Sequence, residues 1–166
     1  MKKKIKFYKT SNNRRIRYSL INQEKGLIII FFHGFMSDMS GEKPIAFERL
    51  AKKLKIGFLK FEYSGHGKSS GNFTDGTISK WTSDAKQLIK NKIDNNKKLI
   101  FIGSSMGSWI ALNLAIYFKR QLKGFVGIAS APEFTDKIMW KQFSKKIKIE
   151  LKKNKIVEIK NEYGSF

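Results

Sequence analysis

The chain has 166 residues, no cysteine, two histidines and a formal net charge of +21. This length suits a single domain, and the absence of cysteine excludes a disulfide framework and a cysteine-based metal site. The charge is spread evenly, because residues 1–83 hold 17 Lys and Arg against 6 Asp and Glu, and residues 84–166 hold 17 against 7. Nucleic-acid-binding proteins gather positive charge in patches, so we interpret this charge as a solvated surface and expect no specific nucleic-acid partner. With no cysteine and only two histidines we also expect no metal, and we expect no cofactor.

The N-terminal segment is positively charged but lacks the run of about 7–15 apolar residues and the small-residue cleavage site that mark a signal peptide. No later run reaches the ~18 apolar residues that a membrane-spanning helix needs. We therefore expect a cytoplasmic protein with no membrane span.

The first half of the chain predicts three strands and a helix. KIKFYKT and RRIRYSLI alternate polar and apolar residues around Ser11–Asn13, which predicts an antiparallel hairpin at a sheet edge. The continuous apolar run from Leu27 to Phe32 is typical of a strand covered on both faces. Apolar residues recur at helical spacing between Pro44 and Leu54, with the proline suited to the first turn.

The second half alternates strands and helices. GFLKFEY predicts a strand, the Gly- and Ser-rich stretch 64–76 a loop, and Thr77 or Ser79 can cap the next helix. The later elements are a strand at KLIFIG, a helix from Met106 to Phe118 and a strand at GFVGIAS. This alternation predicts an α/β fold with a mainly parallel sheet that is covered on both faces. Beyond Pro132 the pattern weakens: 134–143 favours a helix, and 147–159 fits either a helix or a strand.

The segment Gly103–Gly107, GSSMG, matches the G-x-S-x-G motif of a nucleophile elbow. In that motif a strand leads directly into a helix, and the serine sits on a tight turn that lifts its Oγ off the end of the sheet. Gly103 and Gly107 lack the Cβ atoms that would collide where strand and helix approach closely. We therefore interpret Ser105 as a candidate nucleophile. In an alternative interpretation Ser105 or Ser104 merely caps the helix.

A second motif, FFHGFMS, follows the most apolar strand. Acyl transfer needs two N–H donors that stabilise the developing oxyanion. One candidate is the N–H of Met106, after the nucleophile, and the other is the N–H of Phe35, with Gly34 allowing the backbone to turn. Alternatively, His33 to Phe35 form an ordinary turn. The third motif, FEYSGHGKSSG, predicts a rigid loop near the carboxyl edge of the sheet.

In this order and spacing, the three motifs resemble the α/β-hydrolase fold family from about Leu27 to about Ala131. HGFMSDMSGEKP, FEYSGHGKSSGNFTDGTISKW and LIFIGSSMGSWIAL are similar to the acyl-glucuronide esterase and palmitoyl-protein thioesterase branch and its bacterial relatives. The resemblance implies one α/β-hydrolase domain over 1–166 and a small-molecule or acyl-protein substrate. Carried over by position, the motifs imply a nucleophile at Ser105, oxyanion donors at Phe35 and Met106, and framework residues His33, Gly34, Gly103 and Gly107.

The family places its catalytic acid and histidine after the serine, in that order. Both histidines of this chain, His33 and His66, precede Ser105. We therefore expect an incomplete, truncated or split hydrolase that lacks the last strands, with weak or no activity alone. Acids that follow the serine include Glu133, Asp136 and Glu150.

Two further expectations follow from the resemblance. The strand at GFVGIAS would form an open sheet edge that self-associates or pairs with a complementing C-terminal fragment. Residues 132–166 would begin a lid segment, whose Phe134, Trp140 and Phe143 either line an acyl pocket or belong to the core. The sequence thus predicts an ester or thioester hydrolase or, alternatively, an inactive fragment that acts as an interaction module.

Overall fold

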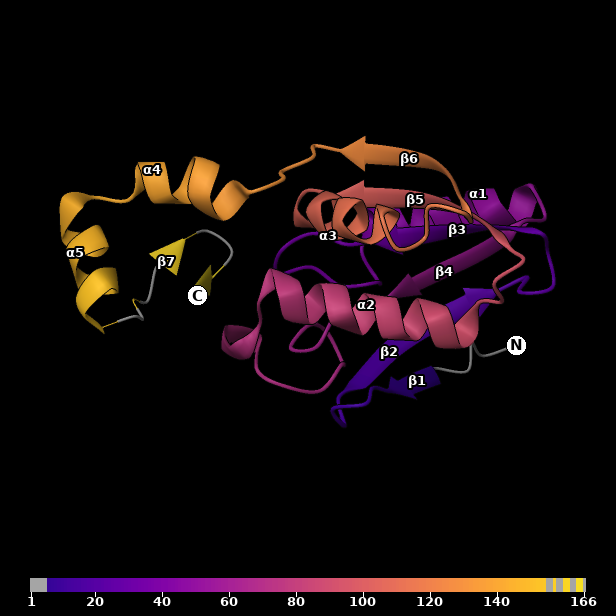
Figure 1. Cartoon of the computed structure of the whole chain (residues 1–166), viewed down its shortest axis with the longest axis horizontal. Helices are drawn as coiled ribbons and strands as arrows, with labels where there is room; N and C mark the ends of the chain where they lie inside the picture. Colours follow the sequence, from indigo (N-terminus) through magenta and orange to yellow (C-terminus); the bar gives the residue numbers. More distant parts are fainter. Residues whose placement is uncertain (1–5, 155–156, 158–159, 162–163, 166) are drawn as a thin grey trace.

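The computed structural model describes residues 6–154, 157, 160–161 and 164–165. Its centre is a six-stranded sheet in the order β1-β2-β4-β3-β5-β6 (Figure 1). β1 and β2 pair antiparallel, as do β2 and β4, whereas the other three pairings are parallel. The predicted mainly parallel sheet with an N-terminal antiparallel hairpin is therefore confirmed. The strands are β1 (Lys6–Lys9), β2 (Arg15–Ile21), β3 (Leu27–Phe32), β4 (Gly57–Phe61), β5 (Lys98–Ser104) and β6 (Leu122–Ile128).

Helices cover both faces of the sheet, as predicted. They are α1 (Glu42–Lys53), α2 (Ile78–Lys92) and α3 (Met106–Ala115), with a 3-10 turn, η1 (Phe73–Asp75), before α2. Successive residues of a strand point to opposite faces, so neighbours on β3 enter separate cores. Phe31 packs with Ala51 of α1, whereas Phe32 packs with side chains of α2 and α3. The hydroxyl of Thr77 accepts a hydrogen bond from the N–H of Lys80 at 3.1 Å, which identifies Thr77 as the cap of α2.

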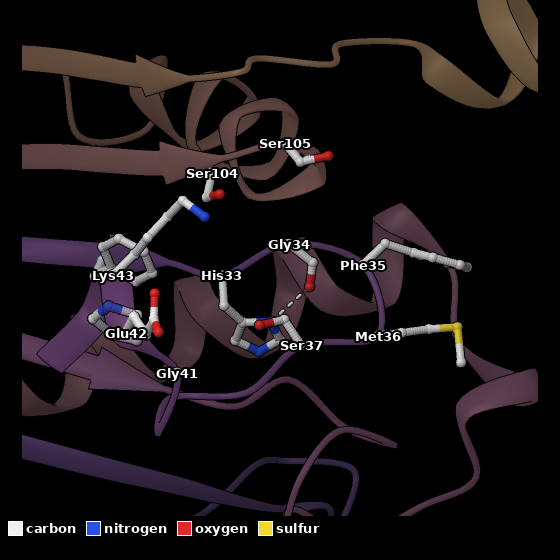
Figure 2. A pocket seen from close by; sticks show the side chains of 12 residues that line it. His33, Gly34, Phe35, Met36, Ser37, Gly41, Glu42, Lys43, Ser104 and Ser105 are labelled. Atoms are coloured by element: carbon white, nitrogen blue, oxygen red, sulfur yellow. Dashed lines mark hydrogen bonds between the residues drawn. The ribbon is translucent and has the colours of Figure 1, made fainter. Parts of the chain in front are cut away.

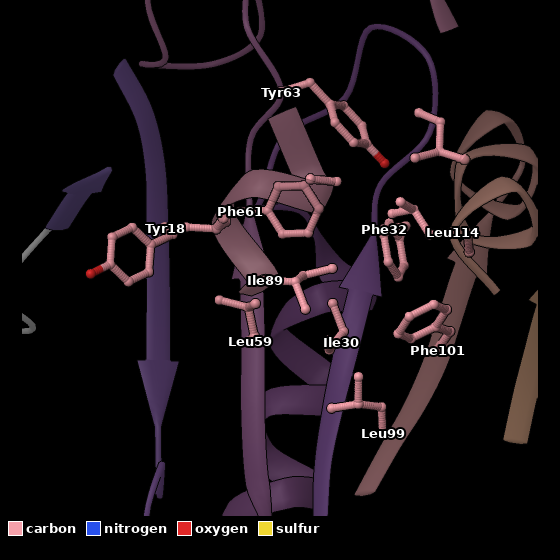
Figure 3. Packing of buried hydrophobic residues seen from close by; sticks show 14 of the residues in the cluster. Tyr18, Ile30, Phe32, Leu59, Phe61, Tyr63, Ile89, Leu99, Phe101 and Leu114 are labelled. Atoms are coloured by element: carbon pink, nitrogen blue, oxygen red, sulfur yellow. The ribbon is translucent and has the colours of Figure 1, made fainter. Parts of the chain in front are cut away.

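The larger core lies between the sheet and the helices α2 and α3. Three phenylalanines from neighbouring strands meet there: the ring of Phe32 lies 5.6 Å from that of Phe61 and 5.0 Å from that of Phe101 (Figure 3). All three are almost fully buried. Because β3 lies between β4 and β5, this layer fixes the relative positions of the strand ends that carry the candidate site.

The segment after β6 begins with helical turns and extends away from the sheet (Figure 1). It contains a short π-helical turn, η2 (Thr135–Met139), then α4 (Trp140–Gln142) and α5 (Lys145–Asn154), followed by the short strands β7 (Lys160–Asn161) and β8 (Gly164–Ser165). The helix expected over 134–143 is broadly confirmed, and α5 resolves the ambiguity of 147–159 as far as Asn154. Residues 155–156 and 158–159 of that range lie outside the described residues. Within the described part, no helix is both long and apolar enough to cross a membrane.

Candidate active site

Ser105 occupies the junction between β5 and α3. Its backbone angles, φ 50° and ψ −121°, lie in a region that side-chain-bearing residues rarely adopt. Two backbone hydrogen bonds of 2.9 Å hold it: its N–H donates to the carbonyl of Ile128, and its carbonyl accepts from the N–H of Ser108. Ser105 is the N-cap residue of α3, but its side chain makes no capping hydrogen bond to the helix, which does not favour the alternative interpretation as a helix cap. Strain of this kind persists only where the surrounding structure enforces it.

The two glycines of the motif sit where backbone segments touch. A Cβ atom on Gly103 would overlap the backbone of Ser108, and one on Gly107 would overlap the carbonyl of Phe32. Ser108 adds a clamp, because its buried hydroxyl donates to the carbonyl of Gly103 at 2.8 Å. The turn around Ser105 is therefore fixed from both sides by backbone that leaves no space for a side chain.

The loop after β3 lies directly against this turn. A Cβ atom on Gly34 would lie 3.5 Å from the Cβ of Ser105. A cavity of about 480 Å³ opens between the two loops, and Figure 2 shows Ser104 and Ser105 on one side of it and residues 33–37 on the other. The start of α1, including Glu42 and Lys43, completes its wall. The sequence motifs that were separated by about 70 residues thus form one site.

His33 fixes the orientation of the peptide that carries the Phe35 N–H. Its Nδ1 lies 2.8 Å from the carbonyl oxygen of Gly34 (Figure 2), so Nδ1 carries the proton and donates. The C=O and N–H of a trans peptide point in opposite directions. Anchoring the Gly34 carbonyl on the imidazole therefore directs the Phe35 N–H away from it. The Phe35 ring packs edge-on against Phe73, at 4.9 Å between centroids.

The two histidines form a buried pair beneath this loop. Their rings lie 5.0 Å apart, and both side chains are at most 3% exposed. Burial lowers the pKa of His33 to about 3, with a further lowering from nearby His66. Burial also lowers the pKa of His66. Among the described residues no hydrogen bond joins either imidazole to Ser105, and each Nε2 is buried without a partner. Burial thus favours the neutral form of both imidazoles.

Sequence reasoning missed two buried carboxylates that hold the loop after β4. Asp84 of α2 accepts from Arg14 Nη2 at 2.7 Å and from the N–H of Ser64 at 3.1 Å. Glu62 accepts from Arg17 Nη1 at 2.8 Å and from the N–H of Lys68 at 2.7 Å. A usable signal was present for Asp84, because it follows Trp81 by three residues and precedes Leu88 by four, on the apolar face of the predicted helix.

The aromatic residues of the C-terminal segment are not equivalent. Phe134 is half-buried, and its ring lies 5.7 Å from that of Phe35 and 6.0 Å from that of Trp109. Trp140 is 38% exposed and contacts Phe143 at 6.5 Å. Phe134 therefore packs beside the loop after β3, whereas Trp140 is not a core residue. The acids of the same stretch, Glu133, Asp136 and Glu150, are exposed.

Comparisons with known proteins agree with this architecture. The family model described as Serine aminopeptidase, S33 matches residues 23–164. The mitochondrial palmitoyl-protein thioesterase ABHD10 of Rattus norvegicus is 33% identical over 136 residues, which is 82% of this chain and 43% of the relative. The human protein of the same name is 36% identical over 105 residues, 63% of this chain and 34% of the relative. The chain thus spans less than half the length of these curated relatives, and a cytoplasmic location remains a prediction.

Two solved structures share the fold. A protein of Agrobacterium vitis S4 described as a hydrolase matches with a TM-score of 0.86 and 34% identity, over 98% of this chain and 68% of that one. Mouse alpha/beta hydrolase domain-containing protein 10 matches with a TM-score of 0.78 and 29% identity, over 91% of this chain and 59% of that one. The predicted α/β-hydrolase fold and the predicted branch resemblance are both confirmed. The chain belongs to the α/β-hydrolase family described as Serine aminopeptidase, S33.

Proposed function

We propose that this chain provides the nucleophile and the oxyanion hole of a serine hydrolase that cleaves esters or thioesters through an acyl intermediate on Ser105. The observation that carries the proposal is the backbone of Ser105, held at φ 50° and ψ −121° beside Gly34. A strained serine at a strand-to-helix turn is the geometry of a nucleophile elbow. The thioesterase names of the relatives support the ester and thioester substrate class.

In the proposed reaction, Ser105 Oγ attacks the carbonyl carbon of the substrate and forms a C–O bond. The negative charge that develops on the carbonyl oxygen is stabilised by the N–H groups of Met106 and Phe35, and by the positive end of the α3 dipole. The intermediate then collapses, and the C–O or C–S bond of the substrate breaks. The departing alcohol or thiol takes up a proton, and water releases the acyl group from Ser105.

The proton of Ser105 Oγ needs a base. The family uses an imidazole that follows the serine in the chain, and no histidine follows Ser105 in this sequence. We therefore propose that an acid and an imidazole from outside residues 1–166 complete the site. Without that base, a serine hydrolase retains roughly 10³–10⁴-fold catalysis over water from its oxyanion hole and binding contacts.

A second candidate function, an interaction module, is favoured by the edge of the sheet. β6 pairs with β5 on one side, and no strand of the described residues pairs with its other side. Phe125 and Val126 of β6 are 36% and 47% exposed. Unpaired strand edges with apolar side chains readily pair with another chain.

Labelling with a fluorophosphonate probe tests the serine mechanism. Folded wild-type protein and the matched variant Ser104→Ala should both be labelled slowly, whereas Ser105→Ala should not be labelled. Labelling that survives Ser105→Ala would place the reactive group elsewhere. No labelling of folded wild-type protein would overturn the proposal for this chain and favour the interaction module.

A further inference from the structure

A second cavity, of about 380 Å³, lies on the α1 side of the sheet and shares no lining residue with the cavity at Ser105. It is bounded by β2, β4, α1 and the loop that precedes α1. Four of its lining side chains are cationic: Arg17 of β2, Lys60 of β4, and Arg49 and Lys52 of α1. The volume falls in the range of small-molecule sites, about 300–1,000 Å³. Its charge makes it a candidate for an anionic ligand.

One buried carboxylate, that of Glu48, forms an ion pair with each of the two lysines of the cavity. Lys60 is only 6% exposed, and its Nζ lies 3.0 Å from Oε2 of Glu48. The other oxygen of the same carboxylate, Oε1, lies 3.0 Å from Nζ of Lys52. A buried lysine needs a counter-charge to remain ionised. Glu48 supplies one negative charge against two positive ones, so this trio keeps a net charge of +1.

Of the two arginines, only Arg49 adds to this excess. Arg17 Nη1 donates to Glu62 at 2.8 Å, which balances its charge, but its Nε is buried and has no hydrogen-bond partner. Arg49 forms no ion pair within the part of the chain that the structure describes. The four cations and two carboxylates therefore leave two positive charges around the cavity. A buried donor without a partner is rare in folded proteins and points to an occupant that satisfies it.

We propose that this cavity binds a phosphate group, as free inorganic phosphate or as a phosphate monoester with an apolar body. A dianion matches the two excess positive charges, and guanidinium groups bind phosphate oxygens with charge-assisted hydrogen bonds. Ser19 and Ser40, whose side chains carry hydroxyl donors, also line the cavity. Met39 and Ile45 provide an apolar wall that would accept the body of a monoester. This proposal is independent of Ser105.

Isothermal titration calorimetry tests the site with two probes, inorganic phosphate and phenyl phosphate, in chloride buffer of matched ionic strength. The double variant Arg49→Gln, Lys52→Gln removes two cations from the cavity. The control Lys53→Gln, Lys90→Gln removes the same charge from exposed positions outside it. Saturable binding to wild type should weaken about tenfold or more in the first variant, because each lost charged hydrogen bond is worth more than a neutral one. The control should bind as wild type does.

The probes separate the sources of the phosphate. Saturable binding of inorganic phosphate supports a free-anion site, and binding of phenyl phosphate alone supports a monoester carried on an apolar body. Absence of saturable binding for both probes overturns the proposal. Equal weakening in the two double variants also overturns it, because binding would then depend on net charge rather than on the cavity.

Discussion

Gly34 and Ser105 are packed so closely that a Cβ atom on Gly34 would make ordinary van der Waals contact, 3.5 Å, with the Cβ of Ser105. The same hypothetical atom would lie 3.4 Å from the carbonyl oxygen of Ser104. The loop that carries the Phe35 N–H therefore lies directly against the turn that carries Ser105. Close approach of these two backbones, more than any single side chain, determines the shape of the candidate site.

The glycines of the site should differ in how well they tolerate alanine. Gly107→Ala should lower the free energy of unfolding by about 3 kcal/mol or more, because the new methyl group overlaps rigid backbone of β3. Gly34→Ala meets only ordinary contacts and should cost less than about 1 kcal/mol. Urea unfolding measures both. Equal losses for the two variants would contradict this account of the elbow.

Asp84→Ala should be among the most destabilising single substitutions. Asp84 is fully buried, and its removal leaves the Arg14 guanidinium and the Ser64 N–H without their acceptor. Breaking a buried pair in this way costs about 3–5 kcal/mol. The exposed Asp94 offers a matched control, since Asp94→Ala should change the free energy of unfolding by less than about 1 kcal/mol. A mild effect of Asp84→Ala in urea unfolding would argue against the pair.

Stability should fall as the pH is lowered below the ordinary histidine pKa. Burial holds the pKa of His33 at about 3, whereas in the unfolded chain the imidazole has its ordinary pKa of 6.5. Between these values the unfolded state binds a proton that the folded state does not. The contribution of His33 is therefore fully present above pH 6.5 and is lost toward pH 3, by roughly 1 kcal/mol per pH unit.

Comparison of slopes isolates this histidine from the carboxylates, which also titrate in acid. His33→Asn should unfold with a shallower dependence of the free energy of unfolding on pH between 6 and 4 (roughly the window in which the unfolded imidazole gains its proton). Urea unfolding at several pH values measures the slopes. Identical slopes for wild type and variant would mean that His33 is protonated in the folded state.

Local patterns predicted most of the fold. The apolar run Leu27–Phe32 forms the central strand β3, and the segment 44–54, whose apolar residues recur at helical spacing, forms most of α1. Both were predictable because each pattern depends only on which residues of one element are buried. The G-x-S-x-G motif also predicted the turn at Ser105, since its glycines are required by close backbone approach. These signals are contained within about ten residues of sequence.

Long-range partners were not predictable in the same way. Arg14 and Asp84 are 70 residues apart, and the local sequence around either residue does not indicate that the two side chains form an ion pair. The contact between His33 and His66 likewise depends on β3 and β4 being neighbours. The cluster of Lys52, Lys60 and Glu48 was not predictable either, because it forms only where α1 packs against β4. From the sequence alone, we interpret the lysines as part of a solvated surface, but these two line a cavity.

The open side of β6 should make the isolated chain self-associate. Its backbone groups are unpaired by any described strand, and Val126 adds exposed apolar surface there. Val126→Lys should shift the protein toward monomer, because a charged side chain on an edge strand opposes pairing with another strand. Ile116→Lys is the matched control, since Ile116, the C-cap residue of α3, is 77% exposed and is not part of β6. Sedimentation velocity over a concentration series measures the distribution of species. A wild-type protein that stays monomeric at every concentration would show that this edge is closed. If both lysine variants shift the protein toward monomer to the same extent, the association depends on exposed apolar surface in general and not on the edge of β6.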